Sequence, residues 1–136
     1  MIEDVLGLGC DILELARLDC LLDKDGDRFV QRVLTTEEQA EWSRRAAKSL
    51  NRGRLFVATR FCAKEAFSKA MGTGIGAQFS FQDLSVLNDE LGRPVLSYSE
   101  RLSIWLQSKR AFAQVSMSDE QHYVMSTVIL YSKTII

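Results

Sequence analysis

The longest helical pattern in the chain, residues 50–71, constrains the fold more than any other segment. Its apolar side chains recur at the spacing of one helical face and include Leu55, Ala58, Cys62 and Ala66. More apolar residues lie beside that face, so the helix must be covered on several sides. We therefore predict a central helix that ends at Gly72, with the other elements packed around it.

The first 48 residues predict one strand and two helices. Residues 5–15 are rich in Val, Leu and Ile and contain two glycines, which predicts a buried strand whose backbone closely approaches another element. Residues 26–34 predict a short amphipathic helix. Thr36 followed by Gln39 resembles a capping box and predicts a second helix through about Lys48.

The second half of the chain is dominated by strand patterns. Residues 81–87 and 93–98 flank an Asn-Asp-Glu-Leu-Gly turn and predict a hairpin. Residues 112–117 and 123–131 predict a final antiparallel pair, preceded by a helix over 99–109. The predicted fold class is α+β, with an antiparallel β-sheet packed on the long central helix, in a single domain over residues 1–136.

Charge and cysteine content restrict the function and the compartment. The formal net charge of -1 gives no global attraction to nucleic acid or to a membrane. No apolar run approaches the roughly 20 residues that cross a bilayer, and the acidic N-terminus is unlike a secretory signal. Three widely spaced cysteines suit a reducing compartment or ordinary packing roles. We expect a cytoplasmic protein.

The bases are concentrated between Arg44 and Lys69, where Glu65 is the only acid. Such a stretch can hold a phosphate-rich ligand or can be a solvated helix face. Composition leaves both interpretations open.

Two carboxylates stand out as candidate ligands. Asp11 lies inside an apolar strand, where an unpaired charge is costly, so its partner is an arginine, a backbone cap or a metal ion. Glu65 lies four residues before Lys69 and can form a helical ion pair with it or join Asp11 at a metal. Mg²⁺ that binds substrate phosphates is commonly held by two carboxylates, with its other coordination positions open to water and phosphate.

Two other features carry weaker signals. The loop Gly72-Thr73-Gly74-Ile75-Gly76 can bring backbone amides to phosphates or can simply end the helix. It lacks the Gly-Lys-Ser/Thr ending of a Walker motif. His122 is the only histidine, and we expect it to be structural or exposed. The sequence indicates no Ser-His-Asp triad and no set of zinc ligands.

Taken together, these blocks resemble the holo-acyl-carrier-protein synthases, a family of 4'-phosphopantetheinyl transferases. The resemblance covers nearly the whole chain. The opening block is Gly7-Leu8-Gly9-Cys10-Asp11-Ile12, and the central helix block is Arg60-Phe61-Cys62-Ala63-Lys64-Glu65-Ala66-Phe67-Ser68-Lys69-Ala70, continued by Gly72-Thr73-Gly74-Ile75. The hairpin blocks are Phe81-Gln82-Asp83-Leu84 and Asn88-Asp89-Glu90-Leu91-Gly92-Arg93-Pro94, and the closing strand is Gln114-Val115-Ser116-Met117-Ser118.

This resemblance implies a Mg²⁺-dependent enzyme of lipid metabolism that transfers 4'-phosphopantetheine from coenzyme A to a serine of an acyl carrier protein and releases 3',5'-ADP. It implies Asp11 and Glu65 as magnesium ligands and Lys69 beside the reacting phosphate. It also implies a homotrimer with active sites between subunits, and Arg17 as a contact to the acidic carrier. The implied coenzyme A contacts are Arg60, Lys64, Lys69, Gly72, Thr73, Gly74 and Ser116.

The chain departs from the family pattern at two positions. Members often carry histidines flanking the closing strand, where this chain has Gln114 and Asp119. Gln114 can still hydrogen-bond a phosphate but carries no charge. Asp119 would repel the coenzyme if it points there, or add a ligand if it points at the metal.

Two other functions remain open on the sequence. One is a non-catalytic module that binds coenzyme A or a nucleotide, which the missing histidines favour. The other is an interaction protein whose basic helix docks an acidic partner. The joint presence of Asp11, Glu65 and Lys69 favours the transferase, because neither alternative needs a carboxylate pair beside a lysine.

Overall fold

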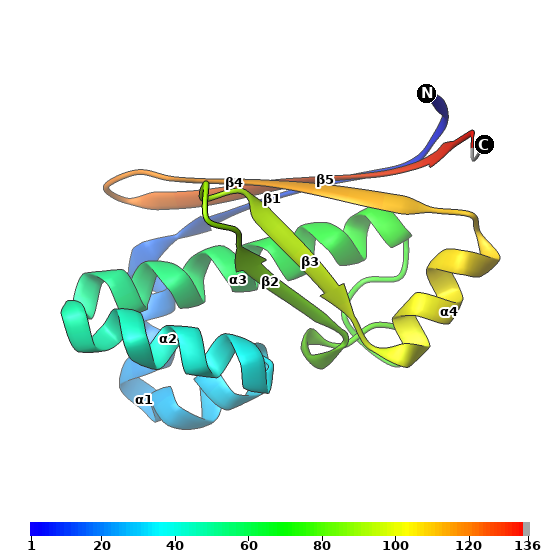
Figure 1. The fold of residues 1–136 in the computed structure, drawn as a ribbon. Coiled ribbons are helices and arrows are strands. Elements are labelled where there is room, and N and C mark those ends of the chain that lie inside the picture. Colours follow the sequence, from blue (N-terminus) through cyan, green and yellow to red (C-terminus); the bar gives the residue numbers. More distant parts are fainter. Residues whose placement is uncertain (135–136) are drawn as a thin grey trace.

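A computed structural model describes residues 1–134 and confirms the α+β fold class. Figure 1 shows a long sheet lying over helix α3, with α1 and α2 on the other side of that helix. In chain order the elements are β1 (Ile2–Glu14), α1 (Leu15–Val33), α2 (Thr36–Lys48), α3 (Leu50–Met71), the 3-10 helix η1 (Phe81–Asp83), β2 (Leu84–Asn88), β3 (Pro94–Tyr98), α4 (Glu100–Ser108), β4 (Phe112–Asp119) and β5 (Tyr123–Lys133).

The strands form two antiparallel sheets. The larger has the order β1-β5-β4, so the first strand of the chain pairs with the last, and β2 and β3 form the separate hairpin. Asp11 lies opposite Ser126 of β5, which in turn lies opposite Met117 of β4. The predicted hairpin and the predicted final antiparallel pair are both confirmed.

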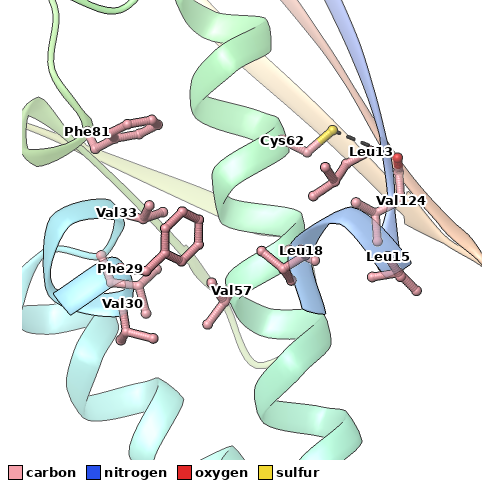
Figure 2. Close-up of a cluster of buried hydrophobic side chains, with 12 residues drawn as sticks. Leu13, Leu15, Leu18, Phe29, Val30, Val33, Val57, Cys62, Phe81 and Val124 are labelled. Atoms are coloured by element: carbon pink, nitrogen blue, oxygen red, sulfur yellow. Dashed lines mark hydrogen bonds between the residues drawn. The ribbon is translucent and has the colours of Figure 1, made fainter. Parts of the chain in front are cut away.

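Helix α3 lies at the centre, as the sequence predicts. Thirteen of its residues are buried, on several sides of the helix. Figure 2 shows one of the two hydrophobic clusters that cover it, where Cys62 and Val57 of α3 meet Leu13, Leu18 and Phe81. Within residues 1–134, no helix is both long enough and apolar enough to cross a membrane.

The helices before α3 differ from the prediction. Helix α1 begins at Leu15, well before residue 26, and is interrupted by non-helical backbone at Asp25. The capping box of α2 uses Thr35 and Glu38, one residue earlier than the predicted Thr36 and Gln39. The predicted start of the hairpin at Phe81 is also wrong, because residues 81–83 form a 3-10 turn before β2.

The prediction that the first strand is buried is wrong for one of its two faces. Leu8 and Ile12 are 65% and 63% exposed, and Met125 of the neighbouring strand is 43% exposed. Alternate residues of a strand point to opposite faces, so only the face towards α3 is covered. The other face presents apolar side chains that no element within residues 1–134 covers.

The two glycines of β1 explain how closely that strand lies on α3. A Cβ at Gly7 would lie 2.0 Å from the carbonyl oxygen of Ala70, and a Cβ at Gly9 would lie 1.9 Å from that of Ala66. No side chain fits at either position. The predicted close approach of the strand backbone is therefore confirmed, and it brings Asp11, two residues further on, to the same helix.

Candidate functional site

The first part of the candidate site lies between β1 and α3. Asp11 is on the face of β1 towards α3, and its Oδ1 accepts a hydrogen bond from Lys69 Nζ at 3.0 Å. The same ammonium donates to the carbonyl oxygen of Cys10, also at 3.0 Å. The Lys69 side chain is still 52% exposed, so it retains a free face towards solvent or a ligand.

Glu65 lies one turn before Lys69 and belongs to the same group of charges. Burial raises the pKa of the Glu65 carboxyl, the negative charge of Asp11 raises it further, and Lys69 and Arg32 oppose the rise. Within residues 1–134, Glu65 forms no ion pair, so Lys69 pairs with Asp11 rather than with its helical neighbour. The structure thus brings Asp11, Glu65 and Lys69 together.

The donor set of this group suits a hard divalent cation. Within the described residues, no cluster of three or more His, Cys, Asp or Glu side chains could hold a metal. Asp11 and Glu65 supply two carboxylates, and Mg²⁺ is commonly held by one or two carboxylates together with waters and substrate phosphates. A cation between them would also relieve the repulsion that raises the pKa of Glu65.

The second part of the candidate site is a basic pocket of about 550 Å³ on the other side of α3. Its walls come from α2, α3, the β2–β3 hairpin and β4. Its lining includes the cations Arg44, Arg45, Lys48, Arg52 and Arg60, together with Asn88, Ser116 and Asp119. The concentration of positive charge makes this pocket suited to phosphate groups.

The cations of the pocket differ in what they already bind. Arg44 and Arg45 both donate hydrogen bonds to Glu41, and these bonds lower the pKa of the Glu41 carboxyl to about 2. Both arginines are therefore already held by a carboxylate. Lys48 and Arg52 form no ion pair with any residue in 1–134, which leaves their charge available. Asp119 is exposed at the end of β4 and is the only carboxylate in the lining.

Two sequence-predicted contacts lie deeper than the resemblance implies. Lys64 has no exposed surface, and its ammonium is bonded to Glu38 and to two backbone carbonyls. The implied coenzyme A contact does not fit this position. Arg60 lines the pocket but is only 3% exposed, and burial, with the charge of Arg45, lowers its pKa to about 10.

The glycine loop after α3 ends the helix. Gly72 has a left-handed φ of 82°, and the amides of Gly72, Thr73 and Gly74 donate to the carbonyl of Ser68 at 3.1, 3.2 and 3.3 Å. These amides therefore all donate to the end of the helix. This geometry supports the simpler interpretation of a helix cap.

The remaining predicted residues fall on the surface. Arg17 is exposed in the first turns of α1, directly after the strand that carries Asp11. His122 is exposed in the turn between β4 and β5, as expected. Gln114 faces outward from β4 and lines a separate cavity with Arg93.

The bases of α2 were visible in the sequence only as part of a charged stretch, and their clustering around one pocket was not predicted.

The comparisons with known proteins agree on one family. Residues 7–128 match the 4'-phosphopantetheinyl transferase superfamily. A holo-[acyl-carrier-protein] synthase of Herminiimonas arsenicoxydans is 42% identical over 129 residues, which cover 95% of this chain and 99% of the relative. The same enzyme of Vibrio parahaemolyticus is 43% identical and covers 94% of this chain and 98% of the relative.

Solved structures give the same result. The fold matches the crystal structure of the holo-[acyl-carrier-protein] synthase from Neisseria meningitidis with a TM-score of 0.85 and 38% identity, over 93% of this chain and 98% of that one. The synthase from Bacillus anthracis in complex with CoA (3',5'-ADP) matches with a TM-score of 0.77 and 37% identity, over 95% of this chain and 98% of that one.

Proposed function

The chain belongs to the 4'-phosphopantetheinyl transferase superfamily, and we propose from this that it transfers the 4'-phosphopantetheine arm of coenzyme A to a serine of an apo acyl carrier protein. The observation that carries the proposal is the grouping of Asp11, Glu65 and Lys69 between β1 and α3. The rival interaction module requires no such grouping.

The reaction is a phosphoryl transfer. The serine hydroxyl oxygen forms a bond to the β-phosphorus of coenzyme A, the bond from that phosphorus to 3',5'-ADP breaks, and the hydroxyl proton is released. Catalysis of this kind rests on alignment and charge neutralisation. Lys69, held by Asp11 and the carbonyl of Cys10, would place its positive charge beside the transferring group.

Asp11 and Glu65 would hold the Mg²⁺ that the family resemblance implies. When bound there, the cation supplies positive charge against the diphosphate of coenzyme A. The raised pKa of Glu65 supports this role, because a carboxylate that burial and a like charge disfavour gains most from a nearby cation.

The basic pocket is suited to the nucleotide end of coenzyme A. Lys48 and Arg52, which lack ion-pair partners in residues 1–134, are candidates for the 3'-phosphate, with Ser116 and Asn88 as neutral hydrogen-bonding groups. Bacillus anthracis synthase was crystallised with CoA (3',5'-ADP), which supports a nucleotide ligand for the shared fold.

The two parts of the site lie at opposite edges of one sheet, which supports an assembly of several copies. Asp11 is on β1, the pocket is lined by β4, and β5 lies between them. A copy that presents its β4 edge to the β1 edge of the next would bring one pocket to one carboxylate pair. Such head-to-tail contacts form a ring when the rotation between copies closes, and we propose the homotrimer that the resemblance implies.

The exposed apolar face of the sheet is a suitable surface for that assembly, since no element in residues 1–134 covers Leu8, Ile12 and Met125. Arg17, exposed in the first turn of α1, is suited to the acidic surface of a carrier protein. Three free cysteines, two of them exposed, suit the reducing conditions of the cytoplasm.

The decisive experiment is the intact mass of an apo acyl carrier protein after incubation with the purified chain, coenzyme A and Mg²⁺. The expected result is a gain of one phosphopantetheine that EDTA abolishes. Binding of coenzyme A without this gain, across carriers from several pathways, would instead identify the non-catalytic binding module.

A further inference from the structure

A fully buried ion pair between Lys64 of α3 and Glu38 of α2 lies outside both parts of the proposed site. Neither side chain has any exposed surface. The Lys64 ammonium donates to Glu38 Oε1, to the carbonyl of Val33 at 2.7 Å and to the carbonyl of Phe81 at 2.9 Å. All three of its N–H groups are used, so none remains for a ligand.

Glu38 connects this pair to the hairpin. Its Oε1 also accepts the backbone N–H of Thr35 at 2.9 Å, and its Oε2 accepts the N–H of Val86 at 2.8 Å. Val86 is in β2, which pairs with β3 along only one edge. On the other edge of β2, a carboxylate of α2 therefore takes the place of a neighbouring strand.

Arg60, one turn before Lys64 on α3, completes this attachment. Its Nε donates to the carbonyl of Val86 at 2.8 Å, and its Nη2 donates to Asn88 Oδ1 at 2.6 Å. The same amide oxygen of Asn88 accepts from Arg45 of α2 at 3.0 Å. Side chains of α2 and α3 thus hold both the N–H and the carbonyl of Val86.

The attached elements are the walls of the basic pocket. Helix α2 supplies Arg44, Arg45 and Lys48, and the hairpin supplies Asn88 and Pro94. Their spacing depends on contacts that converge on Glu38 and Lys64. If one charge of the pair is removed, the other keeps its backbone hydrogen bonds but stays buried without a counter-charge, which disfavours the present spacing of α2 and the hairpin.

We propose that Lys64 and Glu38 are positioning residues for coenzyme A binding, which set the spacing of α2 and the β2–β3 hairpin around the basic pocket without touching the ligand. The inference rests on the proposed function, because it takes coenzyme A as the ligand of that pocket. Lys64 would thus position the walls of the pocket, whereas Lys69 on the same helix would act beside the transferring group.

The test compares Lys64→Met with the double variant Lys64→Met/Glu38→Gln. Coenzyme A binding is measured by calorimetry, and carrier modification is measured at saturating coenzyme A. For Lys64→Met we expect a dissociation constant raised roughly tenfold or more, because displaced binding groups lose alignment. The turnover number should stay within about threefold, because the Asp11, Glu65 and Lys69 group is untouched. The double variant should regain most of the affinity, since no unpaired charge remains.

Two results would overturn the proposal. An unchanged affinity in a folded Lys64→Met protein would show that the pair does not set the pocket. A loss of affinity that the double variant does not recover would show that the unpaired charge is not what disturbs the pocket. If Lys64→Met does not fold, the single variant Glu38→Gln keeps the side-chain shape and must show the same loss of affinity with retained turnover.

The parent protein separates this inference from the proposed function. A parent that binds no coenzyme A and modifies no carrier contradicts the proposed function. A fully active parent with variants of unchanged affinity contradicts only the role of the buried pair.

Discussion

Lys69 Nζ lies 3.0 Å from Asp11 Oδ1, and this contact joins the last turn of the longest helix to the first strand of the chain. Asp11 is 19% exposed and Lys69 is 52% exposed, so the pair lies at the surface with the lysine outermost. A surface ion pair alone contributes only about 0–1 kcal/mol to stability. Stability alone therefore gives little reason for the pair, whereas the proposed function does.

Removal of Lys69 tests that conclusion. We expect Lys69→Ala to lower the turnover number of carrier modification by roughly 10²–10³-fold, as when another preorganised charge-stabilising donor is lost. The melting temperature should hardly change. Lys109→Ala, at the end of α4, is the control and should leave both quantities as in the parent. A Lys69→Ala enzyme with normal turnover would reduce Lys69 to a surface ion-pair partner.

A methyl group at Gly9 tests the contact between β1 and α3. A Cβ there would meet the Ala66 carbonyl oxygen at 1.9 Å, so Gly9→Ala should lower the free energy of unfolding by about 1–3 kcal/mol or more. A Cβ at Gly26 would have no other atom within 4 Å, so Gly26→Ala should be neutral or slightly stabilising. Urea unfolding of both variants measures the difference, and equal stabilities would contradict the close packing.

Asp83 should make stability depend on pH in the acid range. Burial raises the pKa of its carboxyl, but hydrogen bonds from Arg101, Ser99 and the Ser80 amide outweigh this and lower it to about 2. Because the folded pKa lies below the unfolded value, this stabilisation is present above about pH 4 and is lost as the pH falls towards 2.

The matching variant is Asp83→Asn. It should lose about 2 kcal/mol at pH 7 and differ progressively less from the parent as the pH falls. Urea unfolding between pH 7 and pH 2.5 gives both curves. Asp25→Asn, at an exposed pair with Arg28, is the control and should follow the parent throughout. Parallel curves for Asp83→Asn and the parent would contradict the assignment.

Asp119 should weaken the attraction of the basic pocket for coenzyme A. Its carboxylate is the only one in the lining, so Asp119→Asn should tighten coenzyme A binding by about 2–5-fold at low salt, and the gain should shrink at high salt. Glu120→Gln, the next residue but outside the lining, should show no gain. If Asp119→Asn weakens binding instead, the carboxylate accepts a hydrogen bond from the ligand.

Ile12 tests the assembly. It is 63% exposed on the apolar face of the sheet, so Ile12→Asp should convert the proposed trimer into single chains. Light scattering after size exclusion reports the mass. Ile104→Asp changes a residue of similar exposure, 58%, on α4 and should keep the parent's mass. A trimeric Ile12→Asp protein would place the interface elsewhere.

The long helix was the most predictable part of the fold. Its apolar periodicity and Gly72 predicted residues 50–71, and these are the bounds that the structure shows. Local signals of this kind act over a few turns of chain and need no distant partner. The start of α1 was missed, because residues 15–25 carry no cap and are interrupted at Asp25.

Lys64 and Glu65 mark what local signals could not decide. They are neighbours in the chain, and the family resemblance implied that Lys64 contacts coenzyme A and that Glu65 binds the metal. Successive helical residues point in directions about 100° apart, so Lys64 is directed into the contact with α2 while Glu65 shares the face of Lys69. Only the packing of α2 and the hairpin buries the first and leaves the second beside Asp11.

The sequence by itself determined the α+β class, the central helix, the glycines of β1 and the three residues Asp11, Glu65 and Lys69, because each depends on residue type or short-range spacing. The tertiary structure decided which charges meet. It paired Lys69 with Asp11, gathered the bases of α2 around one pocket and placed the two parts of the site at opposite edges of the sheet. Contacts between residues far apart in the chain depend on how whole elements pack, and no local pattern contains that information.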